Sequence, residues 1–208
     1  WNKAAFPNVG FDDVYFPPLP PRPDAAWRAG GIIHLYGTSI PKVVVLGSSH
    51  AQMYSRLIDD ICREQDLSVA FFTMSGRSVF FESVPDEFDM TRLRWLREWR
   101  PVTVIVIERW DGREAWHETS RSIDRKLSSL FRTLCPLADH VILVAQVPAL
   151  GVSTAINLRG IITCRMNLVN RLPHLYPDMY EPLRKQAIAT AEAAKADFAN
   201  LSVLRADL

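Results

Sequence analysis

A glycine and two serines directly follow a run of aliphatic residues early in the chain, where residues 43–50 read VVVLGSSH. A serine hydroxyl becomes a strong nucleophile only when a neighbouring base removes its proton, and the oxyanion that forms on an acyl carbon needs hydrogen-bond donors aimed at it. A tight turn between a strand and a helix can expose a hydroxyl and leave backbone N–H groups free. The pattern therefore predicts a turn that holds a serine nucleophile, an anion or no ligand.

The elements around this turn alternate between strand and helix patterns. Aliphatic runs predict strands at residues 43–46, 68–73, 102–107, 141–145 and 201–204. Helical periodicity predicts helices at residues 50–64, 89–99, 119–134 and 182–198. This alternation predicts the α/β class: a three-layer, doubly wound parallel sheet of about five strands, of the flavodoxin-like type, with helices on both faces.

Spacing within the helices predicts which side chains face the core. On the first helix the inward residues are expected to be Met53, Leu57, Ile58 and Ile61. On the second helix one broad apolar stripe is expected from Met90, Leu93, Trp95, Leu96 and Trp99. The arginines of that helix are most simply explained as its solvated face: Arg92, Arg94, Arg97 and Arg100.

Composition limits the class of protein. A chain of 208 residues with 48% hydrophobic and 23% charged residues fits one globular domain, and a net charge of +1 gives no broad reason to expect nucleic acid as a partner. Cys62, Cys135 and Cys164 lack the spacing of a structural zinc site; one disulfide is allowed but not implied. The chain has no long apolar run and begins with Trp1, so we expect a segment of a longer protein.

Residues 1–41 differ from the rest of the chain. Residues 16–23 read FPPLPPRP, which favours an extended polyproline II arm that acts as a linker or wraps the domain, with an SH3-type ligand as the alternative. Aromatic residues of the arm favour packing against the domain: Phe6, Phe11, Tyr15, Phe16 and Trp27. Residues 42–208 are expected to form the domain itself.

Residues that follow the strands are expected to meet at one edge of the sheet. Ligands of doubly wound sheets bind at the carboxyl ends of the strands, where the strand order reverses. Ser49 follows the first strand, Gly76 the second, and Arg109 and Trp110 the third. These four residues are therefore predicted to converge although they are far apart in the sequence.

The Gly-Ser-Ser-His stretch after a buried strand resembles the first block of the SGNH (GDSL-like) hydrolases. By that resemblance Ser49 is the nucleophile, and Ser48 stands where the family usually has Asp. Residues 104–110, which read VIVIERW, resemble those of one branch, the extracytoplasmic SGNH domains fused to acyltransferase-3 membrane proteins. The resemblance covers about residues 42–208 in element order.

The resemblance also implies an oxyanion hole and a base. The N–H groups of Ser49 and Gly76 match two of the family's donors. No Asn follows the third strand, so Arg109 is the available third donor, or it pairs with Asp111. No Asp-x-x-His block occurs in the chain, so a histidine beyond Leu208 is expected to be the base; the alternative is a domain that has lost its base. Glu114 and His117 have a related spacing but follow the third strand, so they are interpreted as loop or helix-start residues.

Several of these residues have simpler explanations. Ser48 and Ser49 would also suit the cap of the following helix, and Gly76 a plain turn. We assign Ser48 and Trp110 to substrate binding, with a core position as the alternative for Trp110. His50 is interpreted as structural.

The resemblance implies a serine O-acyl esterase or O-acyltransferase that acts on a cell-envelope carbohydrate through an acyl-enzyme. Its expected partners are an acylated carbohydrate or acyl donor and a membrane acyltransferase domain in the same polypeptide, at an extracytoplasmic location and without metal or organic cofactor or nucleic acid. The main alternative is an inactive carbohydrate-binding or scaffolding domain on the same fold. A flavodoxin-like phosphate or nucleotide binder is a third reading, although the chain has no GxGxxG or GxxxxGK motif.

Overall fold

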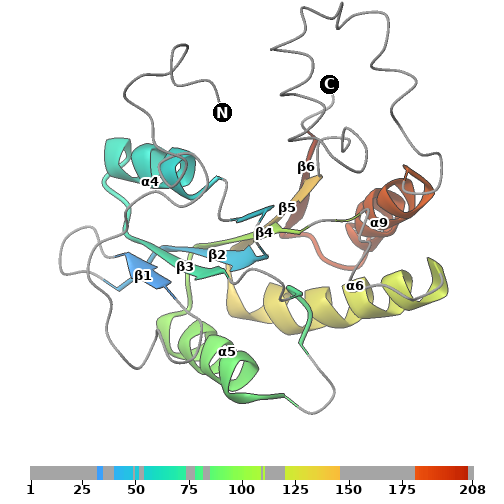
Figure 1. The fold of residues 1–208 in the computed structure, drawn as a ribbon, viewed down its shortest axis with the longest axis horizontal. Coiled ribbons are helices and arrows are strands. Elements are labelled where there is room, and N and C mark those ends of the chain that lie inside the picture. Colours follow the sequence, from blue (N-terminus) through green and yellow to red (C-terminus); the bar gives the residue numbers. More distant parts are fainter. Residues whose placement is uncertain are drawn as a thin grey trace, which may run out of the picture.

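A single six-stranded sheet organises the chain (Figure 1). The computed structural model describes residues 32–34, 40–48, 50–51, 54–73, 78–81, 85–108, 110, 120–145 and 181–205. The strands are β1 (Ile32–His34), β2 (Val43–Gly47), β3 (Val69–Thr73), β4 (Thr103–Ile107), β5 (His140–Ala145) and β6 (Leu201–Arg205), in the spatial order β1-β3-β2-β4-β5-β6. The five strands β2 to β6 are parallel, which confirms the predicted α/β sheet.

The central strands are aliphatic because both faces of the sheet are covered. Every residue of β2 and β3 is buried. Strands of this kind read as continuous hydrophobic runs instead of alternating patterns. The predicted boundaries consequently agree with the observed ones to within one residue at either end. The short strand β1 was not predicted; it pairs antiparallel with β3 at the edge of the sheet and lies inside the stretch 1–41 that we had separated from the domain.

Helices cover the two faces of the sheet and complete three layers. Helix α4 (Ser55–Glu64) packs on one face, over a core cluster that includes Val45 and Phe71. The opposite face carries α5 (Glu87–Trp99), α6 (Ser120–Leu134) and α9 (Glu181–Ala194), whose inward residues join a larger cluster with the other side chains of the same strands. A 3-10 turn, η1 (Cys135–Leu137), ends α6. Figure 1 shows α4 on one side of the sheet and α5 and α6 on the other.

The predicted inner face of α4 is wrong for two residues. Leu57 is 57% exposed and Ile61 is 50% exposed, whereas Ser55 and Cys62 are buried. Ile58 packs against the core as predicted, and Met53 lies outside the described residues. The buried residues Ser55, Asp59 and Cys62 are spaced four and three residues apart, so they share one face of the helix, which is rotated away from Leu57 and Ile61.

Helix α5 departs from the prediction at two positions. Met90 is 60% exposed, so it does not belong to the apolar stripe, although Leu96 is fully buried and Trp95 and Trp99 pack against the core. Arg92 was predicted to be solvated and is instead 0% exposed. Its charge is balanced by Asp89, one turn earlier on the same helix.

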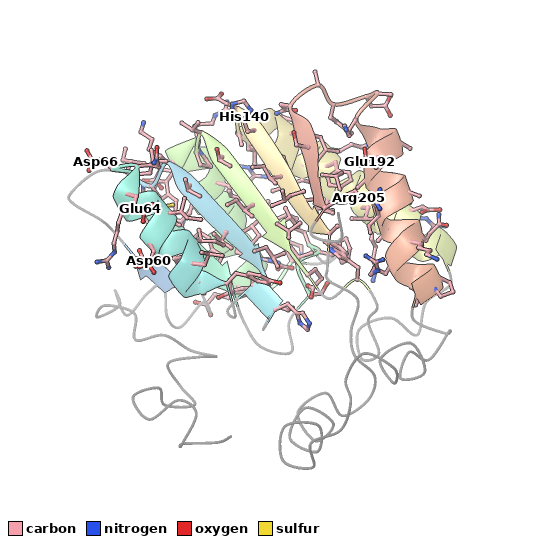
Figure 2. All side chains as sticks on the ribbon, turned by 90° about the horizontal axis from the view of Figure 1, so that it is seen from above. Asp60, Glu64, Asp66, His140, Glu192 and Arg205 are labelled. Carbon is pink, nitrogen blue, oxygen red and sulfur yellow. The ribbon has the colours of Figure 1, made fainter. Side chains whose placement is uncertain are left out.

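The order of the strands reverses at β2, which has β3 on one side and β4 on the other. In Figure 2, Asp60 and Glu64 follow one another along α4 towards the edge at which His140 begins β5. The start of α4 is therefore at the carboxyl edge of the strands. Within the part of the chain that the structure describes, no helix is long and apolar enough to cross a membrane.

Candidate functional site

Strand β2 ends in a glycine that no other residue can replace without displacing the backbone. A Cβ at Gly47 would lie 1.9 Å from the carbonyl oxygen of Ile107 on β4. Real Cβ contacts are essentially never below 3.0 Å. The glycine therefore allows β2 to stay paired with β4 as far as its last residue. Ser48 follows directly, at the point where the strand order reverses.

Ser48 forms the first turn after β2 and is buried. Its Oγ accepts a hydrogen bond from the N–H of His50 at 3.5 Å, and its carbonyl oxygen accepts one from the N–H of Ala51 at 3.0 Å. Both contacts are typical of a residue that caps a helix, so they favour the capping alternative for Ser48 over substrate binding. Ser49, the predicted nucleophile, lies outside the described residues, between this cap and the helical residues 50 and 51.

The segment that follows β3 is held by a carboxylate from another strand. Gly76 lies outside the described residues, but residues 78–81 downstream of it are described. The N–H of Val79 donates to Glu108 Oε2 at 2.8 Å. Glu108 is the residue after β4 and is 5% exposed, while Val79 is fully buried. The hydrogen bond therefore links the segment after β3 to the residue that follows β4.

Arg92 holds the same segment from the side of α5. Its Nη1 donates to the carbonyl oxygen of Val79 at 3.2 Å, and its Nη2 donates to that of Phe80 at 3.3 Å. The guanidinium carbon lies 4.7 Å from the ring centroid of Phe81 and 4.5 Å from that of Phe88. The two rings and the two carbonyl groups thus enclose a cation that is also paired with Asp89.

Trp110 follows β4 and was assigned to substrate binding, with a core position as the alternative. Its side chain is 1% exposed, and its Nε1 donates to the carbonyl oxygen of Val144 on β5 at 2.8 Å. Its ring makes an edge contact with Phe80, with 6.4 Å between the centroids. An indole buried on both sides offers no face to a sugar ring, so the geometry favours the core position. Arg109, the predicted third oxyanion donor, lies outside the described residues.

The structure places the carboxyl ends of β3 and β4 on either side of the end of β2. The convergence of Ser49, Gly76 and Arg109 stays a prediction, because all three lie outside the described residues. The structure adds two residues that sequence reasoning missed as contributors, Glu108 and Arg92. The sequence offered a clue for Glu108, because it directly follows a buried aliphatic strand, and a carboxylate at such a position is rarely buried without a partner. The sequence offered none for Arg92, because its backbone partners lie 12 and 13 residues away.

The two described cysteines have no part in this site. Cys62 and Cys135 are free and buried, and burial raises the pKa of each thiol from 9.0 to about 11. For Cys62 the nearby charge of Asp59 adds to this effect. Both thiols are therefore protonated near neutral pH and poor nucleophiles. Cys164 lies outside the described residues.

Among the described residues, no cluster of potential metal ligands forms a second site. His140 lies at the start of β5, on the edge of the sheet opposite to the serine turn (Figure 2). Across the described parts of the chain, no group of three or more His, Cys, Asp or Glu side chains could hold a metal ion. His117, Glu114 and His174 lie outside them.

Comparison with protein families decides the identity of the fold. A family model described as the SGNH domain fused to AT3 domains matches residues 22–206, nearly the whole chain. The chain belongs to this family. The match begins inside the proline-rich stretch, upstream of the boundary at residue 42 that we had drawn. No curated protein matched this SGNH domain by sequence.

A solved structure with a TM-score above 0.5 shares the fold of this SGNH domain at low sequence identity. The periplasmic domain of a lipopolysaccharide acetyltransferase from Salmonella ser. Paratyphi A has a TM-score of 0.55 at 10% identity, over 79% of this chain and 66% of that one. A GDSL-like lipase from Bacteroides thetaiotaomicron has a TM-score of 0.47 at 14% identity, over 78% and 67%. A family two carbohydrate esterase from Clostridium thermocellum, in complex with cellohexaose, has a TM-score of 0.46 at 10% identity, over 79% and 53%. The chain thus spans about two thirds or less of the length of these solved chains.

Proposed function

We propose that this SGNH domain is a serine O-acyl esterase or O-acyltransferase that acts on a cell-envelope carbohydrate, with Ser49 as its nucleophile. The observation that carries the proposal is the position of the serine turn. It follows a strand that can end only in glycine, at the point where the strand order reverses, in a chain matched by the SGNH family.

The chemistry proceeds through an acyl-enzyme. Ser49 Oγ attacks the acyl carbonyl carbon while a histidine base takes the hydroxyl proton. The tetrahedral oxyanion accepts hydrogen bonds from the N–H groups of Ser49 and Gly76, with Arg109 as a third donor. The histidine then gives its proton to the departing alcohol or thiol, and the acyl group stays on Ser49 as an ester. Water or a sugar hydroxyl attacks that ester in the second half-reaction and regenerates the serine. We place the histidine beyond Leu208.

The family description and one structural neighbour support a proposal for the membrane partner and the location. The family description pairs this domain with AT3 domains, and the Salmonella neighbour is a periplasmic acetyltransferase domain. We accordingly propose that the full protein carries a membrane acyltransferase domain, that the SGNH domain is extracytoplasmic, and that the acyl group passes through Ser49 to the carbohydrate. The proposed chemistry needs no metal ion or organic cofactor.

The test is ester turnover by the full encoded protein with and without the hydroxyl. A Ser49→Ala variant is expected to lose at least about 10³-fold in kcat/KM on a p-nitrophenyl acetate substrate, because the acyl-enzyme cannot form. Ser129→Ala, at an exposed position on α6, is the matched control and is expected to retain the parent rate. Equal turnover by Ser49→Ala and the parent protein would remove the esterase proposal and leave the carbohydrate-binding alternative.

A further inference from the structure

Two buried charged residues hold the segment that follows β3, and their place in the fold gives them a specific use. We propose that Glu108 and Arg92 are positioning residues that fix the loop carrying Gly76, so that its N–H stays aimed at the oxyanion. This inference rests on the proposed function. It concerns neither a substrate contact nor a proton transfer by either residue.

The described residues on either side of Gly76 are held by contacts with other elements. Upstream, Thr73 is the last residue of β3 and pairs in register with Gly47 of β2. Downstream, Val79 has its N–H bound by Glu108 and its carbonyl oxygen bound by Arg92. Gly76 is three residues from Thr73 and three from Val79, and three residues of chain span at most about 10–11 Å, so the positions of these two residues limit where its amide can lie.

Glu108 connects two of the three segments that carry the proposed oxyanion donors. It is the residue directly after β4 and directly before Arg109, and its carboxylate reaches a segment 29 residues earlier in the chain. Strand β2 lies between β3 and β4 in the sheet. The hydrogen bond to Val79 therefore joins the two sides of the strand that delivers Ser49, and it sets the position of the Gly76 loop relative to Arg109.

Arg92 adds a geometric restraint that a simple positive charge would not give. Its planar guanidinium donates to two successive carbonyl groups, those of Val79 and Phe80, while Phe81 and Phe88 cover it. A lysine has the charge but not the fixed fork of donors. Burying an ion pair such as Arg92 with Asp89 stabilises a fold weakly or not at all, compared with apolar residues of the same size. A use in fixing the backbone accounts for a buried arginine better than stability does.

Small displacements of a donor have large effects on rate. A shift of about 1 Å in a catalytic group lowers the rate by up to roughly 100-fold, and loss of one oxyanion donor costs about 10²–10³ in kcat. Donors of this kind act on the transition state and hardly on the bound substrate. Weakening the hold on Val79 should consequently lower kcat and leave KM unchanged.

The experiment compares three variants of the full encoded protein with matched controls on α5. Glu108→Leu removes the acceptor, Arg92→Lys keeps the charge and removes the fork, and Glu108→Gln keeps an acceptor oxygen at the same side-chain length. Arg97→Lys and Glu98→Gln are the controls, because both residues are exposed on the same helix. Steady-state kinetics on p-nitrophenyl acetate are measured well below the melting temperature of every variant, together with hydrogen exchange at the Val79 amide.

We expect Glu108→Leu and Arg92→Lys to lower kcat at least tenfold with KM within twofold of the parent, and to speed exchange at Val79. Glu108→Gln is expected to recover most of the loss, and it keeps the test decisive if Glu108→Leu fails to fold. Faster exchange or a lower melting temperature with unchanged kcat would overturn the positioning role while the proposed function stands. A raised KM at constant kcat would also overturn it, since that result indicates substrate contact. Absence of Ser49-dependent turnover in the parent protein overturns the proposed function and this role with it.

Discussion

A methyl group on Gly47 would lie 1.9 Å from the carbonyl oxygen of Ile107 on the neighbouring strand. The obstacle is backbone, so no side-chain rotation can relieve it. We predict that Gly47→Ala destabilises the domain by about 3 kcal/mol, the upper part of the range for overpacked cores, or prevents soluble expression. Chemical denaturation of the purified variant measures this loss.

A second variant separates the backbone obstacle from the side-chain one. Ala51→Gly removes the 2.6 Å contact that the new methyl group would make with Ala51 but leaves the contact with Ile107. The double variant is therefore expected to be no more stable than Gly47→Ala. Recovery of parent stability in the double variant would show that the helix, and not β4, imposes the glycine.

Trp110 provides a test between a packing role and a sugar-binding role. Trp110→Phe removes the hydrogen bond to the carbonyl oxygen of Val144 and keeps an aromatic ring against Phe80. Since the lost partner stays buried, we expect the free energy of unfolding to fall by roughly 1–3 kcal/mol, with KM for an acylated carbohydrate unchanged. A raised KM at unchanged stability would restore the substrate-binding assignment.

The strands could be predicted from the sequence much better than the faces of the helices. A strand covered on both faces needs hydrophobic residues throughout. Strands β2 and β3 can therefore be recognised in the sequence as continuous hydrophobic runs. A helix turns only one face to the sheet, and apolar residues outside that face stay exposed. On α4 the buried residues are Ser55, Asp59 and Cys62, while Leu57 and Ile61 face outward, contrary to a prediction that ranks residues by size.

The burial of charged residues near the candidate site could not be predicted from the sequence around them. Arg92 sits among other arginines of α5, and only contacts with Val79 and Phe80 explain its burial. The position of the serine turn, by contrast, was predictable, because strand order in a doubly wound sheet fixes where the carboxyl ends meet. The base was not predictable, since no histidine of the chain has the spacing that the resemblance requires.

Asp124 joins the two helices α6 and α9. Its Oδ1 accepts hydrogen bonds from Gln186 Nε2, at 2.9 Å, and from the hydroxyl of Thr190. Asp124→Ala leaves both donors without this acceptor, so we expect a loss of roughly 1–3 kcal/mol in the free energy of unfolding. Arg125→Ala, at the exposed neighbouring position, should change it by less than about 0.5 kcal/mol. Equal effects of the two variants would contradict the bridging role.

The buried thiols predict a dependence of stability on alkaline pH. Burial raises the pKa of Cys62 and Cys135 from 9.0 to about 11 in the folded chain. Between these values the unfolded state releases protons that the folded state retains, so stability falls as pH rises from 9 to 11 and is independent of these groups below pH 9. Other groups also titrate there, so the comparison is with the Cys62→Ala/Cys135→Ala double variant. Its melting temperature should fall less steeply over this window; identical slopes would contradict the prediction.

The most direct test of the account is covalent capture of the nucleophile. A fluorophosphonate probe reacts with an activated serine hydroxyl, and peptide mapping by mass spectrometry locates the adduct. On the full encoded protein we predict one adduct, on the peptide that contains Ser49, and its loss in Ser49→Ala but not in Ser129→Ala. An adduct on a different serine, or ester turnover that persists in Ser49→Ala while the parent takes up no probe, would contradict Ser49 as the nucleophile.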